Sequence, residues 1–208
     1  MEIFQIFLLA AISIIGFRSD CDLSDYKKSK IVPGIIPITP EMPIQVFYKN
    51  KSFECGSKVD SLSIRRTPTL NYTCDEDKLY TIIMIDVDEL TPQKPILSPY
   101  RLWLVANIPG CNVSEGYTHT KYFVPIRSSQ PDPHRYIMMI YEQPRRITFQ
   151  KESSNKSELQ EFINRQKFDL NGFVQDKYLK GRFMDIFSTL YLLSLKQSIS
   201  LSAPYLNN

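Results

Sequence analysis

The stretch that decides the fold is Tyr80–Thr91, "YTIIMIDVDELT". Its uninterrupted apolar run is rich in isoleucine and bounded by polar residues, which predicts a β-strand buried on both faces. The run ends in Asp86 and Asp88, two carboxylates separated by one residue. Burying a carboxylate without a partner costs free energy, so the pattern indicates that solvent, a cation or a ligand meets these two side chains.

Short runs of the same character follow one another along most of the chain. Valine, isoleucine, tyrosine and phenylalanine dominate them, and Gly, Pro, Asn or Asp separate them, which is typical of a Greek-key β-sandwich. The other runs are "IQVFY", "SLSI", "TLNYT", "LWLVANI", "KYFVPI" and "RYIMMIYE". We therefore predict a mostly-β fold with helices near the C-terminus. One helix is expected at 157–166, behind a Ser157 cap, and a second at 185–197, "DIFSTLYLLSLKQ".

Polar side chains stand at the ends of the predicted central strands. Strand alternation places Asp86 and Asp88 on one face, and it places His134 and Tyr136 on one face of the strand near 134–143. Gathered at one rim, such groups would form a pocket with a few convergent polar atoms. The alternative is that each of them caps a strand at the surface.

The N-terminus predicts export. Residues 3–17, "IFQIFLLAAISIIGF", have the length of a signal-peptide core and are too short to cross a bilayer as a helix. An uncleaved membrane anchor is the alternative, because Glu2 stands where a basic residue is usual. We expect a signal peptide at 1–19, an extended lead-in at 20–43 and one domain at 44–208. The mature chain is expected to be extracellular and without a membrane span.

Cysteines and glycosylation sequons agree with export. No cysteine pair has C-x-x-C or zinc-like spacing, so disulfides fit better than a metal site. Four cysteines allow three connectivities, and the sequence does not choose among them. The disulfide candidates are Cys21, Cys55, Cys74 and Cys111, and the N-glycosylation candidates are Asn50, Asn71, Asn112 and Asn155.

Charge and motifs argue against two classes of function. The 25 basic and 22 acidic residues give a formal net charge of +3, and no basic block interleaved with aromatics predicts a nucleic-acid partner. The chain has two histidines, His119 and His134, and it lacks G-x-S-x-G, H-E-x-x-H and glycine-rich phosphate motifs. We therefore expect a protein that is not an enzyme and that holds no metal or cofactor.

Three ordered segments resemble the signatures of the phosphatidylethanolamine-binding protein family, which includes Raf kinase inhibitor protein and plant flowering regulators. They are "KLYTIIMIDVDELT" at 78–91, "WLVANIPG" at 103–110 and "HRYIMMIYEQP" at 134–144, and "RQKFDLNGFVQDKYL" at 165–179 resembles a later family segment. The resemblance covers Ile44–Leu190. It implies a large central β-sheet, a second sheet packed on it, flanking helices and a small pocket for phosphate-like groups. The ligand-binding residues that it implies are Asp86, Asp88, Tyr100, His134 and Tyr136.

The same resemblance shows where this chain departs from the family pattern. Leu102 stands at the place of a second pocket histidine, and Glu89 adds an acid within the segment that reads D-P-D-A-P in the family. Two carboxylates with one histidine make a poor phosphate site, because negative charge must be offset by donors or cations. The expected pocket rim is Leu90, Leu102 and Arg127, the last within "VPIRSS", which replaces a Gly-Pro-Pro loop.

These features predict a secreted phosphatidylethanolamine-binding-protein-like binding module with an altered anion or lipid-headgroup pocket. Its expected ligand is a phospholipid headgroup or a small amphiphile. The alternative is an extracellular inhibitor of proteins such as serine proteases, or a signalling ligand, that meets an extracellular protein partner through its surface loops.

Overall fold

The computed structural model describes residues 23–37, 42–53, 56–60, 62–125, 133–149, 157–178 and 186–195, so the expected signal peptide lies outside the described residues. The helices are α1 (Leu23–Lys28), η1 (Val113–Glu115), α2 (Glu158–Arg165) and α3 (Leu170–Tyr178). The strands are β1 (Met42–Pro43), β2 (Gln45–Tyr48), β3 (Lys51–Phe53), β4 (Ser57–Asp60), β5 (Thr69–Asn71), β6 (Leu79–Asp86), β7 (Tyr100–Pro109), β8 (Tyr117–Thr120), β9 (Arg135–Gln143) and β10 (Ile186–Leu195).

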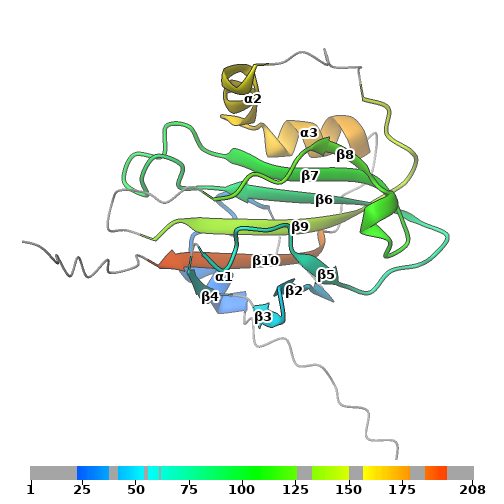
Figure 1. Ribbon diagram of the computed structural model, residues 1–208, viewed down its shortest axis with the longest axis horizontal. Helices are drawn as coiled ribbons and strands as arrows, with labels where there is room; N and C mark the ends of the chain where they lie inside the picture. The colour runs from blue at the N-terminus through cyan, green and yellow to red at the C-terminus, as the bar shows by residue number, and fades with distance from the viewer. Residues whose placement is uncertain are drawn as a thin grey trace, which may run out of the picture.

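Two sheets form the body of the molecule (Figure 1). The large sheet has the order β1-β10-β9-β6-β7-β8, and β4 also pairs with β10. Its pairs are antiparallel except for those that β1 and β4 make with β10. The small sheet has the order β3-β2-β5 and is antiparallel. The predicted mostly-β fold with a large and a smaller sheet is confirmed.

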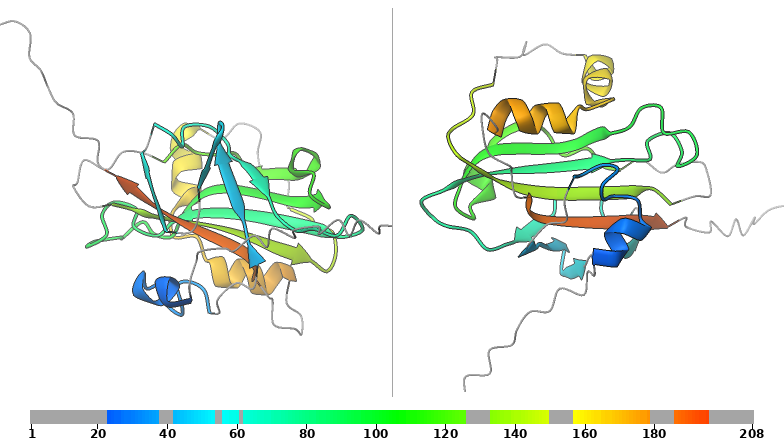
Figure 2. Two further views of the ribbon diagram at one scale, coloured as in Figure 1. Left: turned by 90° about the horizontal axis from the view of Figure 1, so that it is seen from below. Right: turned by 180° about the vertical axis from the view of Figure 1, so that it is seen from behind.

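The central strands are buried on both faces because both faces are covered. One core packs the large sheet against the small one, and the other lies on the opposite face, where α1 and α3 are found (Figure 2). Alternation along β6 divides its side chains as expected, with Ile82 and Met84 in the first core and Ile83 and Ile85 in the second. Apolar residues on both faces are therefore what fixes β6 in the middle of the sheet.

A bulge near the start of β7 breaks the alternation, and a second register shift lies near its end, between the pairs Tyr80–Ile108 and Ile82–Val105. Met84 pairs with Trp103 and Ile85 pairs with Arg101, so Leu102 is an extra residue without a partner on β6. The extra residue places Leu102 in the same core as Trp103, although strict alternation would separate them. The expected rim residue Leu102 is thus part of the core, with 2% of its surface exposed.

Of the two helices predicted near the C-terminus, one is present and the other is a strand. The first predicted helix is confirmed as α2, and the Ser157 hydroxyl accepts a hydrogen bond from the Gln160 amide at 3.2 Å. The helix expected at 185–197 is wrong, because Ile186–Leu195 forms β10 between β9 and the parallel strands β1 and β4. That run is apolar almost throughout, and periodicity alone does not separate a buried helix from a buried strand.

The N-terminal segment is also more structured than expected. Residues 23–37 were predicted to be an extended lead-in, yet they begin with α1 and bury Tyr26, Ile31 and Ile36. These side chains belong to the second core, against the β6 residues Ile83 and Ile85. The segment therefore covers a sheet face whose isoleucines would otherwise meet water.

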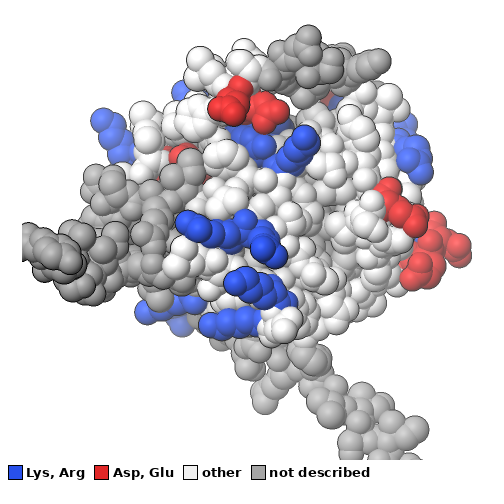
Figure 3. Space-filling view, viewed as in Figure 1, with Lys and Arg blue, Asp and Glu red and all other residues white. Residues whose placement is uncertain are grey.

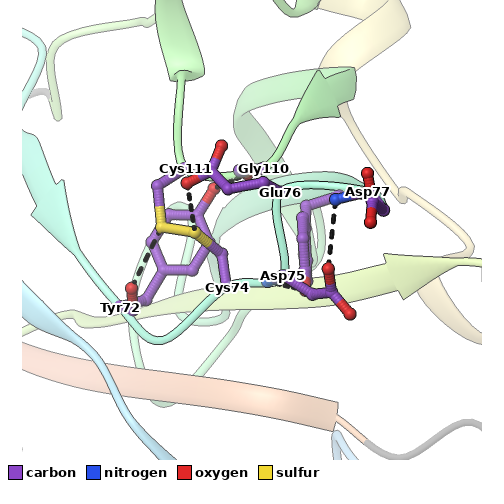
Figure 4. The surroundings of a disulfide bond; sticks show 8 residues. Tyr72, Cys74, Asp75, Glu76, Asp77, Gly110 and Cys111 are labelled. Carbon is purple, nitrogen blue, oxygen red and sulfur yellow. Dashed lines mark hydrogen bonds between the residues drawn. A yellow bond between two sulfur atoms is a disulfide. The ribbon is translucent and has the colours of Figure 1, made fainter.

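A disulfide joins Cys74 and Cys111, which are 37 residues apart (Figure 4). It links the segment after β5 to the turn after β7, where the Tyr72 hydroxyl donates to the Gly110 carbonyl oxygen at 3.0 Å. Cys21 and Cys55 lie outside the described residues. The disulfide therefore fixes one of the cysteine pairs that the sequence left open.

The surface carries the predicted sequons and charges of both signs. Asn50, Asn71 and Asn112 are exposed, and Asn155 lies outside the described residues. Acidic side chains gather near α2 and at one edge of the face in Figure 3, and basic ones lie over its middle. Among the helices in the described ranges, none combines the length and the apolar character needed to cross a bilayer.

Candidate functional site

Four of the predicted site residues meet where the central strands end. Asp86 is the last residue of β6 and pairs directly with Tyr100 on β7 and Tyr136 on β9, so the three side chains leave the same face of the sheet. His134 directly precedes β9, and its Nδ1 lies 2.7 Å from Asp86 Oδ2. All four side chains are buried. The structure thus brings Asp86, Tyr100, His134 and Tyr136 together.

The Asp86–His134 pair is electrostatically coupled. Burial raises the pKa of Asp86, and the hydrogen bond and charge of His134 act against that rise. Burial lowers the pKa of His134, but the hydrogen bond and charge of Asp86 outweigh it, so that the pKa lies above its usual value. Each group therefore favours the charged form of the other, and the pair is a salt bridge whenever His134 is protonated.

Asp88 was expected to face a ligand, but it pairs with Arg135 instead. Its Oδ2 accepts from the Arg135 backbone amide and from Nε, both at 2.8 Å, and its Oδ1 lies 2.6 Å from the second guanidinium nitrogen. Strand β6 ends at Asp86 and the chain bends after it, so alternation no longer applies at Asp88. Both Asp88 oxygens hold the start of β9, and Asp88 thereby positions His134.

Glu89 joins the site although the sequence did not single it out as a site residue. One donor atom from each of Asp86, Glu89 and His134 lies within 4.8 Å of the other two. We call these three residues the Asp86 cluster. Burial and then the charge of Asp86 raise the pKa of Glu89 to about 7. The signal was present in the sequence as an extra acid directly after "DVD".

Glu89 gives a pH-dependent prediction. Its pKa is raised in the folded state, so its contribution to stability is fully present below about pH 4.5 and is lost as pH rises through 7. Glu89→Gln is expected to raise the free energy of unfolding by about 1–2 kcal/mol at pH 8, a shift discounted for partial exposure. The gain should disappear near pH 4.5. Urea unfolding in EDTA, followed by the fluorescence of the single Trp103, measures it.

The control for this prediction is Glu158→Gln, in the exposed first turn of α2. That variant should change the free energy of unfolding at pH 8 by less than about 0.5 kcal/mol, because Glu158 is exposed. A gain in Glu89→Gln that is the same at both pH values would contradict the assignment of the raised pKa to Glu89.

Tyr100 forms an aromatic wall beside the cluster. Its ring lies 5.9 Å from that of Phe123 and 5.7 Å from that of Phe162, between ring centroids. Its hydroxyl is buried and makes no hydrogen bond to any described residue. Burial raises the pKa of Tyr100 to about 12, with Arg165 acting to lower it and Glu89 to raise it. The hydroxyl is therefore a polar group within electrostatic reach of the cluster.

The predicted rim is only partly present. Leu90 is 44% exposed and has a φ of +80°, a left-handed conformation that leucine rarely adopts. Leu102 is in the core, as described above, and Arg127 lies outside the described residues. Leu90 is thus the one predicted rim residue that the described structure places at the surface.

A separate cleft of about 630 Å³ lies between β5 and β7–β8. Leu70, Trp103 and Tyr122 contribute apolar surface to it, and Lys121 is its basic residue. None of the predicted ligand-binding or rim residues lines it. We place the candidate site at the Asp86 cluster because two carboxyl groups and an imidazole, all buried or half-buried, converge there, whereas the cleft offers one half-buried tyrosine, Tyr122, and the exposed Lys121.

The fold consists of two packed sheets, and a buried carboxylate–imidazole pair lies at the end of the central strands. These two features define a class of mostly-β proteins with a polar site at one rim. A sequence profile of the phosphatidylethanolamine-binding protein family matches residues 43–174. The chain belongs to the phosphatidylethanolamine-binding protein family.

Individual proteins agree with this membership. The putative odorant-binding protein A5 of Drosophila melanogaster is 27% identical over 156 residues, which are 74% of this chain and 72% of that protein. The 26 kDa secreted antigen of Toxocara canis is 27% identical over 128 residues, 61% of this chain and 49% of the antigen. The carboxypeptidase Y inhibitor, solved in complex with its cognate proteinase, is similar with a TM-score of 0.67 at 17% identity, over 84% of this chain and 94% of that chain. This last likeness shows the fold alone.

Proposed function

We propose that the protein is a secreted binding module of the phosphatidylethanolamine-binding protein family whose altered site takes a small amphiphile in preference to bare phosphate. The observation that carries the proposal is the buried Asp86–His134 pair at 2.7 Å with Glu89 beside it. Asp86, Tyr100, His134 and Tyr136 are the proposed ligand-binding residues, and Asp88 positions His134 through Arg135.

The charge of the site supports this choice of ligand. A phosphate needs donors or cations to offset its negative charge, whereas Asp86 and Glu89 present two carboxyl groups with His134 as the basic member of the cluster. The exposed Leu90, next to Glu89 in the chain, adds apolar surface that suits an amphiphile. The name of the Drosophila relative, an odorant-binding protein, agrees with a small and partly apolar ligand.

Several features support secretion. The apolar segment within 1–19 suits a signal peptide, and the Cys74–Cys111 disulfide fits an oxidising compartment. Three of the four sequons are exposed, and one relative is a secreted antigen. We propose that the mature chain is a single extracellular, glycosylated domain that does not act as an enzyme.

Native mass spectrometry of the secreted protein, followed by organic extraction, tests the proposed ligand. We expect a co-purifying amphiphile in the parent chain and its loss in Asp86→Asn, with Asp77→Asn as the exposed control. Calorimetric titration with inorganic phosphate should show no binding up to millimolar concentration. Tight phosphate binding that is lost in His134→Gln would contradict the proposal and return the site to the anion-binding function of the family.

A protein-directed inhibitor is the second candidate, because the structurally similar carboxypeptidase Y inhibitor was solved with a proteinase. At 17% identity that likeness concerns the fold, so it does not transfer the partner. A proteinase retained from extracellular fluid by both the parent and Asp86→Asn, with no extractable amphiphile, would favour this second candidate.

A further inference from the structure

The Asp86 cluster has the donor set and spacing of a metal site. Its three donor atoms, two carboxylate oxygens and one imidazole nitrogen, all lie within 4.8 Å of one another. Ligand atoms bound at 2.0–2.2 Å to one ion lie about 3–4.4 Å apart, so side-chain movements of less than about 1 Å would close the cluster around an ion. The end of β6, the bend after it and the start of β9 supply one ligand each.

Tyr100 gives an independent sign that a group belongs beside the cluster. Its hydroxyl is on a side chain with 1% of its surface exposed, and it has no hydrogen-bond partner among the described residues. Tyr100 pairs directly with Asp86, so both side chains leave the same face of the sheet, and Glu89 acts electrostatically on the hydroxyl. A buried hydroxyl without a hydrogen bond is energetically unfavourable, and a bound ion or its coordinated water would supply the missing partner.

The arginines near the cluster are bound to other groups. Asp88 is already paired with Arg135 through both carboxylate oxygens. Arg165, which acts electrostatically on Tyr100, donates to the backbone carbonyls of Arg101, Leu102 and Lys121. Neither guanidinium therefore neutralises Asp86 and Glu89 by direct contact in the described structure.

We propose that Asp86, Glu89 and His134 bind one first-row divalent cation such as Zn²⁺ or Mn²⁺, with the Tyr100 hydroxyl adjoining the bound ion or its water. Two carboxylates and an imidazole suit these ions, whereas Ca²⁺ takes six to eight oxygen ligands. The inference rests on the proposed function, since it names a ligand for the same site. It also departs from the sequence-based expectation of no metal, which considered only cysteine and histidine spacing and did not count Glu89.

Equilibrium dialysis of the full secreted chain tests the site. The protein is stripped with EDTA, dialysed against Zn²⁺ or Mn²⁺ alone, and its metal content is measured by mass spectrometry. We expect one ion per chain, bound at least about 10-fold more weakly in Glu89→Gln and in His134→Gln. Glu89→Gln is the decisive variant, because glutamine keeps the size of this half-buried side chain, and urea unfolding of the same variant in EDTA shows whether it is folded.

Two matched variants distinguish binding at the Asp86 cluster from binding elsewhere on the protein surface. His119→Gln alters the other histidine of the chain, and Glu158→Gln alters an exposed acid, and both should bind the ion as the parent does. No bound ion in the parent, undiminished binding in Glu89→Gln, or weaker binding in His119→Gln would each overturn the cation site. An amphiphile retained by EDTA-stripped protein that binds no ion would overturn the cation site and leave the proposed function standing. Absence of both ligands would overturn both.

Discussion

Replacing Arg135 with methionine is expected to lower the free energy of unfolding by about 3–5 kcal/mol. The Asp88 carboxylate is buried, with 1% of its side chain exposed, and it accepts two hydrogen bonds from the Arg135 guanidinium. Methionine keeps the apolar stem but removes both side-chain donors and the positive charge, so the buried Asp88 carboxylate retains only the hydrogen bond from the backbone amide of residue 135. Urea unfolding followed by Trp103 fluorescence measures the loss.

A surface ion pair provides the control. Lys78 and Glu142 are 2.9 Å apart, but their side chains are 45% and 40% exposed, so Lys78→Met should cost less than about 1 kcal/mol. The double variant Asp88→Ala/Arg135→Met should be more stable than Arg135→Met alone, because it removes the uncompensated charge. If Arg135→Met costs no more than Lys78→Met, burial does not set the strength of the Asp88–Arg135 pair.

The central sheet could be predicted because its signals are local. Uninterrupted apolar runs bounded by polar residues marked β6, β7 and β9, and the three family segments fixed their order. The run at Ile186–Leu195 was misassigned because it has no polar face to reveal its period. It forms a strand because it pairs with β9 on one side and with the parallel strands on the other, and such long-range pairing cannot be predicted from a short segment of sequence.

The sequence predicted which residues form most of the candidate site, but it did not predict how they are arranged. Asp86 and His134 were identified from the sequence. Strand alternation would place Asp88 in the site and Glu89 on the opposite face, but the chain bends after β6, so Glu89 joins the cluster and Asp88 binds Arg135. The absence of a hydrogen bond at the Tyr100 hydroxyl results from the way the ends of two strands and α2 pack together, so no local sequence pattern predicts it. The Cys74–Cys111 pairing likewise follows from the approach of two turns.

The other large expected effect concerns Asn107, near the far end of β7. Its Nδ2 donates to the Ile147 carbonyl oxygen at 2.9 Å, and its Oδ1 accepts from the Ile147 amide at 2.7 Å and from Gln143 Nε2 at 3.0 Å. Asn107→Ala deletes all three hydrogen bonds and leaves buried partners unsatisfied. The free energy of unfolding should fall by about 3–4 kcal/mol, measured by urea unfolding as above.

Backbone conformation contributes part of that loss, and a glycine variant isolates it. Asn107 has a φ of +58°, a left-handed conformation that asparagine and glycine tolerate better than alanine does. Asn107→Gly deletes the same hydrogen bonds without this strain, so it should be about 1 kcal/mol more stable than Asn107→Ala. Equal losses in the two variants would show that the hydrogen bonds account for the whole effect. Asn107 is about 23 Å along β7 from Tyr100, so ligand retention at the Asp86 cluster should be unchanged in both variants that remain folded.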